Sequence, residues 1–216
     1  MNSIFLRAKH WQLFIPLIAI PFVTFLVFGF AFAMILLGHN RNPRGPEEVV
    51  WIFYFFPLIF ALCGFIQFAW FWNVITKLNA LVPTRRGKFP MGRIKLFFFI
   101  PIIYFCVFPF FIAFAVKTTA ISDPSANQML QLGLLGILVF ILHFFSIFCI
   151  LHTIYFAAKT IRSAELKINA RFSSFVGYFF LIWIFPVGIW FIQPRINALL
   201  DKANRSSSST SEELLD

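Results

Sequence analysis

The chain alternates between long apolar runs and short polar segments. Five runs contain no Asp, Glu, Lys or Arg, and they cover residues 11–37, 49–76, 96–116, 129–158 and 175–193. A helix needs about 20 such residues to cross a bilayer, because each residue advances about 1.5 Å through a hydrocarbon layer of about 30 Å. Lipid offers no partner for a free backbone amide, so a helix is expected in each run. The sequence therefore predicts an all-α fold, an integral membrane helical bundle of five spans.

The polar segments between and beside the runs are too short to form domains of their own. The longest has 23 residues, whereas a domain needs about 50 or more. We therefore expect a cytoplasmic N-terminus over residues 1–10, a single transmembrane helical domain over 11–197 and a disordered, serine-rich tail over 198–216. In the segment 159–174, apolar residues recur at spacings of three and four, which predicts a short interfacial helix.

The fifth run allows an alternative arrangement. It is the shortest of the five, and Pro186 and Gly188 lie near its middle. Proline removes a backbone hydrogen bond inside a helix. The alternative to five spans is four spans followed by a C-terminal re-entrant segment. We favour the five crossings, because 19 uncharged residues are of the usual length for a span.

The distribution of Lys and Arg predicts the orientation in the membrane. Positively charged loops remain cytoplasmic. Of the 18 Lys and Arg residues, 12 lie in the N-terminus and in the second and fourth loops, and six lie in the first loop, the third loop and the tail. This bias places the N-terminus in the cytoplasm, and with five crossings the tail is outside. A re-entrant fifth segment returns the tail to the cytoplasm and changes the distribution to 15 against 3.

Composition excludes several classes of protein. Apolar residues make up 60% of the chain, charged residues only 12%, and the mean hydropathy is +0.86. A soluble domain carries about a quarter charged residues, so a soluble enzyme and a disordered chain are both excluded. The net charge of +10 is divided among short loops beside apolar runs. This distribution indicates attraction to anionic lipid and not binding of nucleic acid.

The expected contacts with lipid headgroups are the cations of the second polar loop and one arginine after the fifth run. Each cation near an anionic leaflet contributes about 1 kcal/mol to the attraction. These residues are Lys77, Arg85, Arg86, Lys88, Arg93, Lys95 and Arg195.

The runs offer few groups for chemistry. None contains a carboxylate or an ammonium group, which argues against an ion-coupled transporter. Cys149 and His152 are three residues apart and supply two ligands at most, whereas structural zinc needs four. We therefore predict no enzymatic activity, no catalytic or cofactor-binding residue, no metal site and no cofactor. The polar side chains of the runs are expected to form hydrogen bonds between helices.

Two segments near the C-terminus carry a resemblance. Residues 172–197, FSSFVGYFFLIWIFPVGIWFIQPRIN, and residues 158–166, AKTIRSAEL, resemble small uncharacterised multi-span inner-membrane proteins of Bacteroidota-type bacteria. Those proteins typically carry an acidic residue at the positions that Ser174 and Tyr178 occupy here. The resemblance covers about 40 residues, and it implies a bacterial inner membrane without implying any activity.

These observations together predict a multi-pass membrane protein that acts as a non-enzymatic subunit, scaffold or regulator in the cytoplasmic membrane. Its expected partners are anionic lipids and either a protein partner or a second copy of itself. The alternative is a small channel or carrier for a neutral or lipidic substrate, lined by proline-kinked helices. Gln67, Asn73 and His143 supply the polar groups for this alternative.

Overall fold

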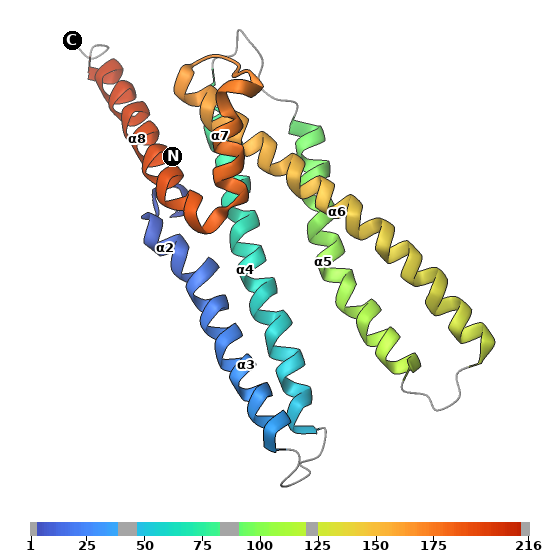
Figure 1. The fold of residues 1–216 in the computed structure, drawn as a ribbon. Coiled ribbons are helices and arrows are strands. Elements are labelled where there is room, and N and C mark those ends of the chain that lie inside the picture. Colours follow the sequence, from blue (N-terminus) through green and yellow to red (C-terminus); the bar gives the residue numbers. More distant parts are fainter. Residues whose placement is uncertain (1–3, 39–46, 83–90, 120–124, 213–216) are drawn as a thin grey trace. The chain divides into compact units, whose positions relative to one another are not determined.

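The structure is a computed structural model that describes residues 4–38, 47–82, 91–119 and 125–212. Within these ranges the chain forms helices and no strand, so the all-α prediction is confirmed. Figure 1 shows the helices in chain order. Their bounds are α1 Ile4–Arg7, α2 His10–Phe14, the π-helix η1 Ile15–Ala19, α3 Ile20–Gly38, α4 Glu47–Asn79, α5 Met91–Thr119, α6 Ala126–Leu166, α7 Phe172–Trp183 and α8 Phe185–Glu212.

Three helical stretches within the described ranges are long and apolar enough to cross a membrane. They are His10–Ala31, Met91–Ile112 and Ala126–Leu166, and they contain much of the first, third and fourth predicted spans. The second predicted span lies within the 33-residue helix α4. The full helices, which are α2 to α3, α4, α5 and α6, extend beyond the predicted spans at both ends, because a helix continues into its polar flanks while its backbone hydrogen bonds are kept.

A π-helix interrupts the start of the first long helix, and two prolines lie at it. In the i→i+5 pattern of η1, the carbonyl of Pro16 would accept a hydrogen bond from the backbone nitrogen of residue 21. That residue is Pro21, which has no N–H to donate. The Cys63 thiol on α4 donates to the Pro16 carbonyl instead, at 3.1 Å. A contact with the neighbouring helix thus satisfies a carbonyl that the proline leaves without a helical donor.

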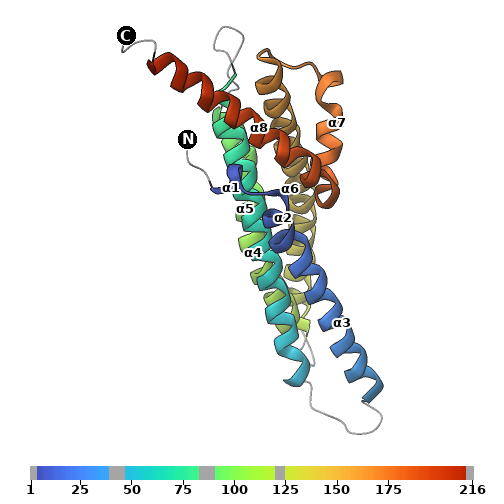
Figure 2. The same ribbon diagram turned by 90° about the vertical axis from the view of Figure 1, so that its left-hand side faces the viewer.

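The chain divides into two compact units, and the division falls inside α6. The first unit holds Met1–Lys88 and Ala157–Asp216. Its core is formed by α4, the end of α6, α7 and α8, and Trp70, Phe175, Ile189 and Ile196 are almost entirely buried there. In this unit α1 and α2 lie beside α8, and α1 also lies beside α4 (Figures 1 and 2).

The second unit, Phe89–Phe156, is a hairpin of α5 and the first three-quarters of α6. Aromatic rings join the two helices: Phe97 packs against His152, with ring centroids 4.4 Å apart, and against Phe148, with centroids 6.1 Å apart. Pro101 and Pro109 lie inside α5 without ending it. Membrane helices tolerate proline in this way, because neighbouring groups satisfy the freed carbonyls.

The segment after residue 158 differs from the prediction of a separate interfacial helix. α6 continues to Leu166, its last residue. Lys167 follows it with a φ of 56°, the left-handed conformation that is common directly after a helix. The backbone N–H of Ala170 then donates to the Ser163 hydroxyl at 3.0 Å, which closes the turn into α7. Ile161 is buried in the core, so it does not belong to a lipid-facing stripe.

The fifth run and the tail also differ from the favoured prediction. Residues 175–193 do not form one helix, because α7 ends at Trp183 and α8 begins at Phe185. The two helices run in opposite directions from this break (Figure 1). A disordered tail was predicted from residue 198, whereas α8 continues to Glu212 in the structure. Ala198, Leu199 and Leu200 are strong helix formers and extend a helix that already exists. Residues 213–216 lie outside the described part of the chain.

Candidate functional site

The turn between α7 and α8 positions the candidate site. The N–H of Ile184 donates to the Phe180 carbonyl at 2.9 Å and closes α7, and the N–H of Gly188 donates to the Ile184 carbonyl at 2.9 Å and opens α8. Residue 186 is a proline in the first turn of α8, where its missing N–H costs no helical hydrogen bond. A Cβ on Gly188 would lie 1.6 Å from the Leu181 carbonyl oxygen, so only glycine fits this close approach.

A chain of four polar side chains joins α6 to the hairpin of α7 and α8. Nη1 of Arg162 lies 2.8 Å from Oε2 of Glu165, one turn along α6. The Tyr178 hydroxyl on α7 donates to Oε1 of the same carboxylate at 2.6 Å. Nη1 of Arg195 on α8 donates to the Tyr178 oxygen, and its guanidinium carbon lies 5.4 Å from the centre of the tyrosine ring. We call these four residues the arginine–tyrosine cluster.

Two positive charges flank one negative charge in the arginine–tyrosine cluster, so its net charge is +1. Tyr178 is buried, Arg162 and Glu165 are partly exposed, and Arg195 is exposed. The Nε of Arg162 is buried and has no hydrogen-bond partner among the described residues. Burial strengthens the interactions within the cluster, because less water screens them. The arrangement therefore holds two guanidinium groups in fixed positions at the partly exposed edge of the unit.

A second polar cluster fixes the N-terminal segment to α8 and is fully buried at its centre. The Trp70 indole N–H donates to Oε1 of Gln193 at 3.0 Å. Nε2 of Gln193 donates to the carbonyls of Leu6 and Ala8, both at 3.0 Å. Asn197 adds a bond to the Ala8 carbonyl at 3.3 Å. The chain is not helical between α1 and α2, so these carbonyls lack helical partners and the two side chains satisfy them instead.

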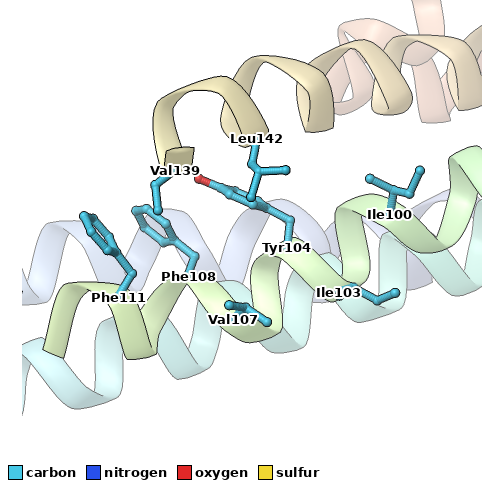
Figure 3. A pocket seen from close by; sticks show the side chains of 8 residues that line it. All are labelled: Ile100, Ile103, Tyr104, Val107, Phe108, Phe111, Val139 and Leu142. Carbon is cyan, nitrogen blue, oxygen red and sulfur yellow. The ribbon is translucent and has the colours of Figure 1, made fainter. Parts of the chain in front are cut away.

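The second unit contains a small apolar groove. It has a volume of about 210 Å³ between α5 and α6 and is lined by apolar side chains with Tyr104 among them. Figure 3 shows Tyr104 and Phe108 directed toward α6, where Val139 and Leu142 lie. The Tyr104 hydroxyl lies 2.9 Å from Nδ1 of His143. This contact satisfies both polar groups inside an otherwise apolar surface.

The cations predicted to contact headgroups do not gather at one place within a unit. Lys77 is exposed in the last turn of α4, in the first unit. Arg93 and Lys95 are exposed in the first turn of α5, in the second unit. Arg195 belongs to the arginine–tyrosine cluster. The remaining three, Arg85, Arg86 and Lys88, lie outside the described residues.

Sequence reasoning identified Arg195 but missed its partners. Glu165 is the only acidic residue between positions 124 and 200. A lone carboxylate beside apolar helices needs a partner, and this signal could have pointed to an arginine. Tyr178 could not have been found in this way, because it lies in an apolar run among other aromatic residues.

Metal-ligating side chains do not gather in the part of the chain that the structure describes: no three His, Cys, Asp or Glu residues there could hold an ion. Cys63 and Cys149 are buried and Cys106 is exposed, and all three are free thiols. His152 lies among aromatic rings, with Phe156 at 4.8 Å between centroids.

The arginine–tyrosine cluster is therefore the candidate site, because it combines charge, partial exposure and fixed geometry. No family model, curated protein or solved structure matches this chain, so its function must be argued from these residues alone.

Proposed function

We propose that this protein is a non-enzymatic, multi-pass protein of the cytoplasmic membrane that acts as a subunit, scaffold or regulator. The observation that carries the proposal is the surface of α6. Phe140, Ile141 and Leu142 are consecutive and exposed by 63%, 59% and 42%. Successive helical residues point about 100° apart, so apolar side chains are exposed on most sides of this helix. Such a surface is stable in lipid or against partner helices and not in water.

We further propose four crossings and a re-entrant hairpin, and two contacts support this topology. Asn197 on α8 bonds to the Ala8 carbonyl, which precedes the first apolar helix. Nζ of Lys167, after α6, lies 3.5 Å from the Leu81 carbonyl, just after α4. The N-terminus, the end of α4, the end of α6 and the middle of α8 thus lie at one end of the first unit. This arrangement supports a cytoplasmic tail and the 15-to-3 distribution of Lys and Arg.

The length of α7 supports the same topology. Its 12 residues extend about 18 Å, which is too short to cross a hydrocarbon layer of about 30 Å. α8 returns from the tip beside α7. A re-entrant segment is stable in the membrane only where protein shields its irregular backbone. Ile182, Phe185 and Gly188 at the tip are buried against the unit, which supports shielding on that side, whereas the side chains of Ile184 and Val187 are exposed.

The channel or carrier alternative receives less support from the described side chains. The Asn73 amide donates to the Ala69 carbonyl of its own helix at 2.8 Å. His143 is held by Tyr104. Groups bound in this way do not present a continuous polar path to a solute.

The proposal is tested by purifying the protein from native membranes in a mild detergent and measuring the mass of the particle. We expect either a homo-oligomer or a complex with a stoichiometric partner. Gly136→Leu on α6 and Gly29→Leu on α3 are matched probes of two surfaces, because an added Cβ meets nothing within 4 Å at either position. We expect one of them to reduce the particle mass. A monodisperse monomer in every preparation would contradict the proposal.

A further inference from the structure

We propose that Arg162 and Arg195 form a binding site for the phosphate of an anionic phospholipid. The inference rests on the proposed function only in that it places these residues at a membrane surface. It adds a specific ligand and a specific pair of residues, one of which, Arg162, was not among the expected headgroup contacts.

Both guanidinium groups have unused hydrogen-bonding capacity. A guanidinium carries five N–H donors. Arg162 donates to Glu165 and also interacts with Tyr178, and Arg195 donates to Tyr178, so neither residue uses all five donors. The buried Nε of Arg162 has no partner among the described residues. Unpaired donors on a partly buried charge are costly, and phosphate oxygens are the acceptors that the planar arginine fork binds best.

The charge of the arginine–tyrosine cluster fits a phosphodiester. Two arginines share one carboxylate, which leaves a charge of +1. A phosphodiester carries one negative charge and makes the assembly neutral. Tyr178 bonds to both Glu165 and Arg195, so the guanidinium of Arg195 is held in place before a ligand arrives. A preorganised site loses less conformational entropy on binding.

The surface of α8 beside Arg195 favours a lipid over free phosphate. Val187, Phe191 and Arg195 are spaced by four residues, so they lie along one side of the helix. The first two are apolar and exposed by 54% and 56%. A lipid whose phosphate binds Arg195 can lay its acyl chains along this stripe toward the tip of the hairpin. The apolar part of this stripe thus matches the acyl chains, and the arginine at its end matches the phosphate.

The test is native mass spectrometry of the purified full-length protein, titrated with phosphatidylglycerol or with phosphatidylcholine. We expect the wild type to bind phosphatidylglycerol more tightly than phosphatidylcholine. One cation near an anionic surface contributes about 1 kcal/mol, or about fivefold. Arg162→Gln and Arg195→Gln should each weaken the binding of phosphatidylglycerol about fivefold. Arg93→Gln removes one exposed arginine on α5 and should change nothing.

Glu165→Gln separates binding from structural damage. It removes the one negative charge of the arginine–tyrosine cluster and keeps one acceptor oxygen, so it retains one of the two bonds that the carboxylate accepts from Tyr178 and Arg162. We expect phosphatidylglycerol to bind about fivefold more tightly, whereas a variant that merely loosens the fold would bind more weakly. Thermal unfolding of each variant shows whether it remains folded.

Three results would overturn the site: equal losses in Arg93→Gln, weaker binding in Glu165→Gln, or displacement of phosphatidylglycerol by inorganic phosphate at the same concentration. Equal losses in Arg93→Gln would indicate diffuse electrostatic attraction to the lipid. Weaker binding in Glu165→Gln would indicate that the cluster is purely structural, and displacement by inorganic phosphate would indicate a site for free phosphate. A monomer that selects phosphatidylglycerol contradicts the proposed function but supports this site. A stoichiometric complex that shows no lipid selectivity supports the proposed function and contradicts this site.

Discussion

Gly188→Ala is expected to be strongly destabilising, because the hairpin of α7 and α8 has no room for a methyl group. The added Cβ would lie 1.6 Å from the carbonyl oxygen of Leu181 and 2.4 Å from its carbon, whereas real Cβ atoms stay at least 3.0 Å from such neighbours. One backbone must therefore move by about 1.4 Å. Overpacking of a well-packed site costs about 1–3 kcal/mol. We expect a loss near the upper end, because both obstructing atoms belong to the backbone.

This loss is measured by thermal unfolding in one detergent, followed by tryptophan fluorescence. For a chain of this size, about 3 kcal/mol corresponds to a fall in Tm of roughly 6–12 °C. Gly177→Ala is the matched control, because the same substitution on α7 meets nothing within 4 Å. Alanine stabilises a helix by roughly 0.5–1 kcal/mol relative to glycine, so Tm should rise by about 1–4 °C. A Tm for Gly188→Ala equal to that of the wild type would refute the described packing of the turn.

Two further substitutions test the buried polar contacts. Gln193→Leu should lower the free energy of unfolding by about 2–5 kcal/mol, because the buried indole N–H of Trp70 and the Leu6 carbonyl lose these bonds, and the Ala8 carbonyl keeps only its bond from Asn197; a loss below 1 kcal/mol in chemical unfolding would contradict the role of this cluster. Cys63→Ala should cost about 1 kcal/mol, because the carbonyl of Pro16 loses its donor, whereas Cys63→Ser keeps a donor and should cost less. Equal losses for alanine and serine would show that the thiol contributes packing alone.

The helices of this protein are predictable from its sequence because lipid allows few alternatives. A long apolar run must satisfy its backbone internally, so runs such as 96–116 and 129–158 become helices whatever their neighbours. Breaks are partly predictable as well. Pro186 and Gly188 mark the interruption of the fifth run, but they do not show whether the chain turns back there. That outcome depends on the close approach of Gly188 to Leu181, a contact that no sequence pattern shows.

The candidate site was less predictable because its partners are distant in sequence. Gln193 is visibly polar within an apolar run, but its partner Trp70 is 123 residues away. Arg195 was predicted to contact a lipid headgroup, and its hydrogen bond to Tyr178 was not predicted. Pairing of this kind depends on how the helices pack, and periodicity along one helix carries no information about it.

The most direct test of the account is whether the two ends of the α7–α8 hairpin lie on the same side of the membrane. Single cysteines at Arg171, before α7, and at Asn204, near the end of α8, are labelled with a membrane-impermeant thiol reagent in intact cells. The background carries Cys63→Ser, Cys106→Ala and Cys149→Ala, and Ser125→Cys serves as the external control. We predict that Ser125→Cys is labelled, and that Arg171→Cys and Asn204→Cys are labelled only after the cells are permeabilised. Labelling of Asn204→Cys but not Arg171→Cys in intact cells would show a fifth crossing and contradict the re-entrant hairpin.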